Sequence, residues 1–295
     1  MEEKKDENKV KKFFINIGKA SLYTGIFFIF QIISTFICSI VVAAKYAISA
    51  AMSGEWMEEA RMTEMLLEKV YNLQGLLTII TGIITLLTLF IIFKIRKRKI
   101  SEKLSLNKIT KSKIAIIAVL AIALEVFITI SLYVLPISEQ LINEYFKNVN
   151  YLMGGNFILV FIAVVIFAPI VEEIIFRGLL LKHLNNVMPT IVAILISSII
   201  FGIGHGQLIW IIYATLIGII LSIVVIRCKS LTASITLHAV LNLTSYIIYF
   251  ANIEMNSIIV FIISGIVMIL ALMGIMIMTK NKEIEKESVE YIEKK

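Results

Sequence analysis

Proline, cysteine and histidine are scarce in this chain of 295 residues, which contains three, two and three of them. Scarce proline favours long unbroken helices, because a proline inside a helix removes a backbone N–H and kinks it. Cys38 and Cys228 form no C-x-x-C pair, so we expect no disulfide and interpret both as small apolar side chains. No cleavable signal peptide is apparent, because the apolar run from Phe13 is too long for a signal core and lacks a convincing cleavage site.

Charged residues are also few, at 17%, whereas hydrophobic residues make up 59% of the chain. Soluble domains are about 45–50% apolar, and the mean hydropathy here is +0.94. The composition therefore predicts an integral membrane protein. The net charge of +7 does not indicate a nucleic-acid partner, because its excess lies in short basic loops beside apolar runs.

The apolar runs predict an all-α, polytopic membrane protein, since a helix needs about 20 apolar residues to cross the hydrocarbon core. About eight candidate spans follow, of which the first and fourth are long enough to tilt or to extend past the membrane. Their ranges are 22–44, 73–95, 114–135, 157–182, 189–205, 208–226, 231–250 and 257–279.

Charge divides the connecting segments into two groups. Basic residues dominate before the first span, between the second and third, and after the fourth, sixth and eighth. Glutamates dominate 53–72, which we expect to form an amphipathic surface helix, and 136–156 is mildly acidic. With eight alternating spans all basic segments share one side, so both termini are expected to be cytoplasmic. The tail 280–295 alternates in charge and is interpreted as a solvated helix or a disordered end.

One integral membrane domain covering 1–295 is the simplest division, because no solenoid-type repeat or low-complexity segment is present. Within it, 1–150 holds the first three spans with their charged loops, and 256–295 holds the last span and the charged tail. The segment 151–255 holds nearly all polar residues that fall inside spans.

The heptad EEIIFRG at 172–178 places three charges inside a stretch otherwise fit for lipid. Each charge costs about 2.5–3.5 kcal/mol at the bilayer centre on insertion scales, so the three must pair, face water or serve in chemistry. Glu173 and Arg177 are four residues apart and can pair on one helical face. Glu172 points about 100° away, and such an unpaired carboxylate can act as an acid or a base. The structural alternative is that all three charges pair between helices or with lipid headgroups.

Two of the three histidines lie at depths that can meet Glu172. Counted from the turns near 186 and 229 at ~1.5 Å per residue, Glu172 lies ~21 Å and Asn242 ~20 Å into the membrane. On the same count His205 lies ~28 Å and His238 ~14 Å deep, so the four side chains can converge on one layer. Glycines at 202, 204 and 206 allow the fifth span to loosen or admit water. His183 follows a helix end and is interpreted as an interfacial residue.

These residue types suit hydrolysis. Glu172 and His205 can share the activation of a water, one as the base and the other orienting the water or passing on the proton. His238 and Asn242 lie one turn apart and can donate hydrogen bonds to an oxyanion. A G-x-S-x-G elbow and an H-E-x-x-H zinc helix are both missing. Glu172, His205 and His238 match the ligand count of a catalytic zinc site, so zinc stays an alternative as a cofactor.

The chain contains E-E-x-x-x-R at 172–177, F-x-x-x-H from Phe201 to His205, and H-x-x-x-N from His238 to Asn242. In this order, and each on a candidate span, the motifs resemble those of the CPBP family of intramembrane proteases (CAAX proteases and bacteriocin-processing enzymes, also called Abi). The resemblance covers roughly 157–250. The first three spans match only in being hydrophobic.

The resemblance implies an all-helical membrane protease with a polar cavity inside the membrane and a catalytic core at 151–255. It implies that Glu172 and His205 activate water and that His238 and Asn242 form the oxyanion site. The supporting residues would be Glu173, Arg177 and Phe201. Family members are often labelled metalloproteases, although a metal-free glutamate mechanism is favoured for those understood structurally.

The resemblance also implies a substrate. Eukaryotic members remove the last three residues of prenylated C-a-a-X proteins, so we expect cleavage near a membrane-embedded or lipidated peptide end. The expected partners are membrane lipid and a peptide or prenylated protein. The Ile- and Lys-rich composition fits a member from a bacterial cytoplasmic membrane.

Two other functions fit the same residues. A non-catalytic membrane protein, such as a bacteriocin immunity or partner-binding factor, would keep the polar core for packing or ligand capture. A proton-coupled transporter would use Glu172 and His205 as a relay, although no inverted repeat supports it. Glu125 is the other acid inside a span. We expect it to pair with a basic residue of another helix or to face the cavity, and assign it no catalytic role.

Overall fold

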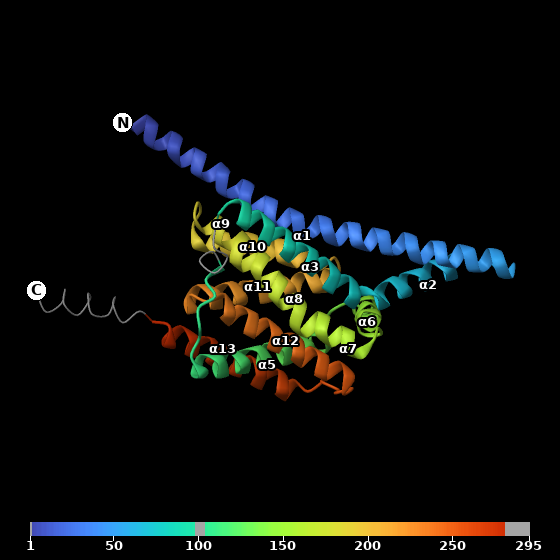
Figure 1. Ribbon diagram of the computed structural model, residues 1–295. Helices are drawn as coiled ribbons and strands as arrows, with labels where there is room; N and C mark the ends of the chain where they lie inside the picture. Colours follow the sequence, from blue (N-terminus) through green and yellow to red (C-terminus); the bar gives the residue numbers. More distant parts are fainter. Residues whose placement is uncertain (1, 98–103, 281–295) are drawn as a thin grey trace, which may run out of the picture.

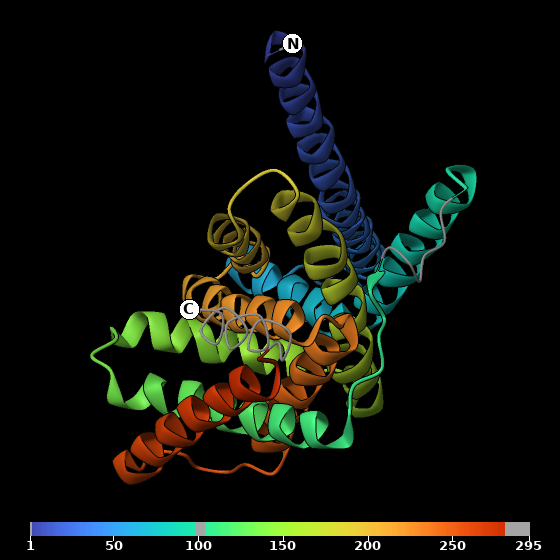
Figure 2. The same ribbon diagram turned by 90° about the vertical axis from the view of Figure 1, so that its left-hand side faces the viewer.

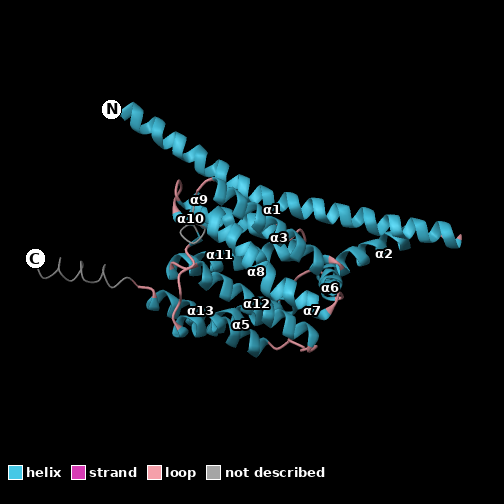
Figure 3. Ribbon diagram, in the orientation of Figure 1, coloured by secondary structure: helices cyan, strands magenta, loops and turns pink. Residues whose placement is uncertain are grey.

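A computed structural model describes residues 2–97 and 104–280, and every regular element in these two ranges is a helix (Figure 3). The all-α prediction is therefore confirmed for the described chain. The charged tail from 281 onward, and the basic residues Arg98, Lys99 and Lys103, lie outside the described residues. Cys38 and Cys228 are free thiols.

Seven helices in the described chain are long and apolar enough to cross a membrane. They are α1 (Glu2–Ser53), α3 (Gln74–Ile95), α5 (Lys111–Val134), a composite helix (Phe157–Asn185), α11 (Leu208–Cys228), α12 (Leu231–Phe250) and α13 (Ile258–Met278). Most agree with the predicted ranges within a few residues. The first differs, because α1 runs for 52 residues and projects well beyond the bundle in both views (Figures 1 and 2).

The fifth predicted span, 189–205, is wrong as a full crossing. It forms α10 (Thr190–Ile203), which has 14 residues. At 1.5 Å per residue this is about 20 Å, short of the roughly 30 Å hydrocarbon core. The helix ends early because Gly204 caps it and Gly206 follows with φ +76°, a conformation that glycine adopts without strain. His205 therefore lies in a turn and not on a spanning helix.

The basic segments lie at one end of the bundle. In Figure 1 the start of α1, the α3–α5 connection, the α11–α12 turn and the end of α13 all point to the left. The helices α2 (Glu59–Asn72) and α6 (Glu139–Met153) lie at the other end. The short α10 still runs away from the basic end and α11 returns to it, so the alternation of directions is kept. Which end faces the cytoplasm stays a prediction.

Both polar connections at the end opposite the basic loops contain a helix. The predicted surface helix at 53–72 is present as α2, whereas α6 was not predicted within 136–156. Lys147 Nζ of α6 donates to Glu64 Oε1 of α2 at 3.0 Å, and Tyr151 stacks on Tyr71 with ring centroids 5.5 Å apart. Lys147 holds the pKa of the exposed Glu64 carboxyl below its usual value through this hydrogen bond. These contacts join α2 to α6.

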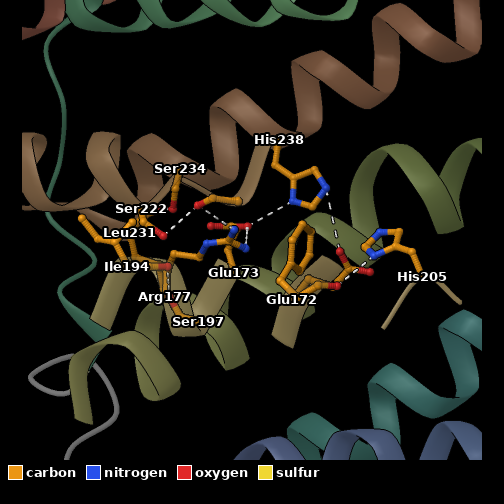
Figure 4. Close-up of polar contacts among 12 residues, drawn as sticks. Glu172, Glu173, Arg177, Ile194, Ser197, His205, Ser222, Leu231, Ser234 and His238 are labelled. Atoms are coloured by element: carbon orange, nitrogen blue, oxygen red, sulfur yellow. Dashed lines mark hydrogen bonds and ion pairs between the residues drawn. The ribbon is translucent and has the colours of Figure 1, made fainter. Parts of the chain in front are cut away.

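Two apolar clusters hold the bundle together. The first joins α1, α3, the composite helix and α10, and it includes Tyr23, Phe93 and Phe176. The second joins α5, α11, α12 and α13, and it includes Leu120 and Leu237. The composite helix of the first cluster meets α12 of the second, and the polar side chains of the core lie at this junction (Figure 4).

Close packing of α10 on α11 depends on Gly202. A Cβ at this position would lie 2.6 Å from the Ile211 carbonyl oxygen and would also collide with Thr215 Oγ1. We therefore expect Gly202→Ala to lower the free energy of unfolding by about 1–3 kcal/mol, the usual cost of overpacking. Unfolding titrations of the purified protein would measure it. The control is Gly18→Ala, which faces open space, and equal stability of the two variants would contradict the prediction.

Candidate active site

The composite helix departs from regular α geometry on both sides of the glutamate pair. It consists of α7 (Phe157–Val160), the π-helix η1 (Phe161–Phe167), α8 (Ala168–Glu173), the π-helix η2 (Ile174–Leu181) and α9 (Lys182–Asn185). π-Helical turns are rare and occur frequently at functional sites. Here they decide which side chains of the composite helix face α12.

Pro169 explains how η1 is tied to α12. The Ala168 N–H donates to the Ala163 carbonyl, five residues back. In this register the backbone N–H of residue 169 would donate to the Val164 carbonyl, but residue 169 is a proline and has no N–H. The side chain of Asn242, on α12, supplies the missing hydrogen bond, since its Nδ2 donates to the Val164 carbonyl at 2.8 Å. One amide hydrogen of Asn242 is thus used in joining the two helices, which leaves its second hydrogen for another acceptor.

Removing the Asn242 side chain should leave the Val164 carbonyl without a donor. We expect Asn242→Ala to lower the free energy of unfolding by about 1–3 kcal/mol, the cost of an unsatisfied buried polar group. Adding Pro169→Ala restores a backbone N–H next to that carbonyl, so the double variant should regain part of the loss. Thermal unfolding of the single and double variants measures both effects. A double variant that loses the sum of the two single effects would contradict this explanation.

Glu173 and Arg177 form the predicted ion pair in the core. Arg177 Nη1 donates to Glu173 Oε1 at 2.8 Å, and Arg177 Nη2 donates to the Gly218 carbonyl at 3.1 Å. Glu173 is completely buried. The pair therefore anchors the composite helix to α11 through a charge-assisted network that excludes water.

Glu173 also contacts His238, which the sequence did not predict. His238 Nδ1 lies 3.1 Å from Glu173 Oε1, and its Nε2 lies 3.8 Å from Glu172 Oε2. The ring therefore bridges the two neighbouring carboxylates, as Figure 4 shows. The i,i+4 spacing of Glu173 and Arg177 gave no sign of this third partner, because His238 comes from another helix.

His205 approaches Glu172 from the other side (Figure 4). Its Nδ1 lies 3.0 Å from the Phe201 carbonyl oxygen. A carbonyl only accepts, so Nδ1 carries the proton and Nε2 of the neutral ring is the accepting atom. The four-residue spacing of Phe201 and His205 therefore fixes the tautomer through the last turn of α10.

The Phe201 ring contacts the cation and both histidines. The guanidinium carbon of Arg177 lies 4.4 Å from the ring centroid, which is a cation–π contact. His205 and His238 meet the same ring edge-to-face at centroid distances of 4.9 and 5.9 Å. Sequence reasoning placed Phe201 among the supporting residues only through a family motif. The structure gives it a physical role in separating and orienting the two imidazoles.

A cavity of about 760 Å³ contains the four residues predicted to be catalytic, Glu172, His205, His238 and Asn242. The Glu172 side chain is 19% exposed, in contrast to the enclosed Glu173. Residues of α1, α2 and α6 also line the cavity, together with residues of α3, α5, α11 and α12. The cavity therefore extends from the glutamate pair toward the end of the bundle opposite the basic loops.

Of the two remaining polar candidates, Glu125 lines this cavity and His183 is buried elsewhere in the bundle. Glu125 faces the cavity, one of its two expected positions. His183 is not part of its lining, and its Nδ1 pairs with Asn16 Oδ1 at 2.9 Å while its ring stacks on Tyr23. It joins α9 to α1, in keeping with a structural role.

The zinc alternative needs Glu172, His205 and His238 to converge on one point. In the part of the chain that the structure describes, no group of three histidine, cysteine, aspartate or glutamate side chains is arranged to hold a metal ion. His238 Nδ1 is directed to Glu173 and His205 Nδ1 to a carbonyl, which leaves one nitrogen of each ring. As arranged, these side chains do not fit a three-ligand zinc site.

Comparison with known proteins identifies the central part of the chain. Residues 154–244 match the family model described as type II CAAX prenyl endopeptidase, Rce1-like. These residues hold all three motifs, so the predicted resemblance is confirmed. A search of curated proteins and a search of solved structures each found no match. The family match and the seven apolar helices indicate an integral membrane protein and support a role as an intramembrane protease.

Proposed function

We propose that the protein is a peptidase that hydrolyses a peptide bond near a membrane-embedded or lipidated peptide end, with Glu172 as the central base. The observation that carries the proposal is the position of Glu172. It is the partly exposed member of the glutamate pair, and it lies between two imidazoles in a cavity within the Rce1-like domain.

The hydrogen bonds suggest a route for the protons. Glu172 takes a proton from a water held between its carboxylate and His205 Nε2, and the hydroxide attacks the peptide carbonyl. Glu173 accepts from His238 Nδ1–H, so Nε2 of that neutral ring can accept the proton from Glu172 across the 3.8 Å gap. The protonated His238 and the second amide hydrogen of Asn242 then donate to the oxyanion. Collapse of the intermediate needs one proton on the leaving amine, and His238 returns the proton that it holds, either directly or back through Glu172.

Glu173, Arg177 and Phe201 are positioning residues in this scheme. Glu173 holds His238 through Nδ1, and Arg177 holds the Glu173 carboxylate in place. Phe201 fixes the angle of both rings. None of the three needs to touch the substrate.

A lipidated or membrane-embedded peptide suits the cavity, because the cavity lies among apolar helices. The family description adds prenylated C-a-a-X ends as the first substrate class to test. A bacterial cytoplasmic membrane, with the basic end of the bundle and both termini in the cytoplasm, remains our proposal for its location.

The test is cleavage by the purified protein of quenched fluorescent peptides, prenylated and unprenylated, in detergent and in vesicles. Wild type should cleave, and should prefer a peptide that carries the lipid. Exhaustive chelation before the assay tests the zinc alternative, since a metal-free Glu172 mechanism keeps full activity. No cleavage of any peptide, with the protein folded, would favour a non-catalytic binding factor.

A further inference from the structure

A carboxylate that the proposed chemistry does not use lies in the same cavity. Glu125 of α5 is 8% exposed, and its Oε1 accepts from Thr129 Oγ1 at a long 3.4 Å. Ser245 of α12 interacts with the same carboxylate. Within residues 7–97 and 104–280, no ion pair joins Glu125 to a lysine, arginine or histidine. A buried acid is normally paired, and here the cavity provides room for a partner from outside.

Aromatic rings line the cavity together with this carboxylate. Tyr145 of α6 makes edge-to-face contacts with Trp210 and Tyr213 of α11, at centroid distances of 5.9 and 6.2 Å. All three rings line the cavity together with Glu125. Burial, and after it the nearby Glu125 carboxylate, raise the pKa of the Tyr145 hydroxyl. A carboxylate among aromatic faces is the chemistry that recognises an ammonium or guanidinium group.

The helix α12 gives the distance of this cluster from the catalytic centre. His238 and Ser245 both line the cavity, and they are separated by about 10 Å along the axis at 1.5 Å per residue. An extended peptide advances about 3.3 Å per residue. The Glu125 cluster is thus about three residues along a bound chain from the bond at Glu172.

We propose that Glu125, Tyr145, Trp210 and Tyr213 form a subsite that binds a lysine or arginine side chain of the substrate, about three residues from the cleaved bond. The proposal rests on the proposed function, because it takes the occupant to be a peptide cut at Glu172. In this subsite the ammonium of a bound lysine pairs with Glu125 and packs against the three rings. The subsite therefore selects the charge of the substrate side chain as well as its length.

Cleavage of matched peptides tests the subsite. In a series of quenched peptides a single lysine is moved along the chain, and each peptide has a counterpart with norleucine, which keeps the stem and lacks the charge. We expect wild type to favour lysine over norleucine by roughly 10–100-fold in kcat/KM at one position near three residues from the cut. Glu125→Gln should reduce this ratio to near one, and Tyr145→Leu should reduce it in part. The control Glu144→Gln changes an exposed carboxylate of α6 and should keep the ratio.

A binding measurement separates this proposal from the proposed function. The variant Trp56→Phe with Glu172→Gln leaves Trp210 as the remaining tryptophan, and its fluorescence reports binding without cleavage. In dodecyl maltoside the lysine peptide should bind roughly tenfold or more tightly than its norleucine counterpart, and Glu125→Gln should remove the difference. Displacement by added phosphatidylcholine would assign the cluster to a lipid headgroup and overturn the proposal.

The two assays give distinguishable failures. Cleavage without any preference for lysine overturns the subsite and leaves the peptidase standing. Lysine-selective binding that depends on Glu125, with no cleavage by wild type, supports the cation site and overturns the peptidase. Equal binding of both peptides by the Trp56→Phe, Glu172→Gln protein overturns the subsite whatever the cleavage assay shows.

Discussion

Glu172→Gln is expected to lower kcat/KM for peptide cleavage by roughly 10²–10⁴-fold, the usual contribution of a general base. Glutamine keeps the size of the side chain and one accepting oxygen but cannot take a proton from water. In the proposed scheme neither histidine takes the proton from water directly, because His205 Nδ1 is bonded to a carbonyl and His238 Nε2 receives its proton from Glu172. The loss should therefore appear mainly in kcat.

The same substitution should leave the fold intact. The Glu172 side chain is partly exposed in the cavity. A neutral amide at this position therefore leaves no buried charge without its ion-pair partner. Thermal unfolding of Glu172→Gln is expected within about 0.5 kcal/mol of wild type, as for other accessible positions. The control Glu68→Gln changes an exposed glutamate of α2 outside the cavity lining, and should alter neither stability nor cleavage. Near-normal turnover by Glu172→Gln would contradict the proposed role of Glu172 as the general base.

Arg177→Leu is expected to cause the largest loss of stability. It removes the one cation paired with the fully enclosed Glu173, and breaking a buried pair from one side costs about 3–5 kcal/mol. The Gly218 carbonyl loses one donor at the same time and keeps Ser222 Oγ, which donates to it at 2.7 Å. We expect little folded protein at 37 °C. Arg177→Lys should also be impaired, because a lysine cannot reproduce the planar fork or the stacking on Phe201.

A double variant separates stability from activity at this pair. Glu173→Leu combined with Arg177→Leu removes both charges, and apolar replacement of a whole buried pair is often neutral for stability. We expect the double variant to fold better than Arg177→Leu alone. It should nevertheless stay inactive, because His238 loses the acceptor at Nδ1 that fixes its tautomer. Unfolding titrations and the cleavage assay measure the two effects, and an active double variant would contradict the positioning role of Glu173.

The membrane-crossing elements could be predicted from the sequence because lipid imposes a length and a composition on each of them. The ends of α12 and α13 lie within two residues of the predicted ranges. The fifth span failed for a local reason, since apolar composition extends past Ile203 while the glycines that follow end the helix. The helix α6 was missed because 136–156 has few charged residues, whereas the glutamates of 53–72 pointed to α2.

The candidate site was only partly predictable. Spacing within one helix was sufficient for the Glu173–Arg177 pair, and depth counting brought Glu172 to the level of Asn242, which lies one turn from His238. Contacts between helices depend on rotation about each axis, which two π-helical segments change in the composite helix. The contact of Glu173 with His238 and the bond from Asn242 to Val164 both depend on that rotation.

The contact between α2 and α6 has a consequence for how the cavity exchanges its contents. Both helices line the cavity, yet an ion pair that joins them, Glu64 with Lys147, is exposed to solvent. Dissolved salt weakens such a pair, because the Debye length shrinks from about 10 Å at 0.1 M to about 3 Å at 1 M. The enclosed Glu173–Arg177 pair is shielded from the same ions. Ionic strength should therefore act on entry and release at the rim, and leave the bond-breaking step unchanged.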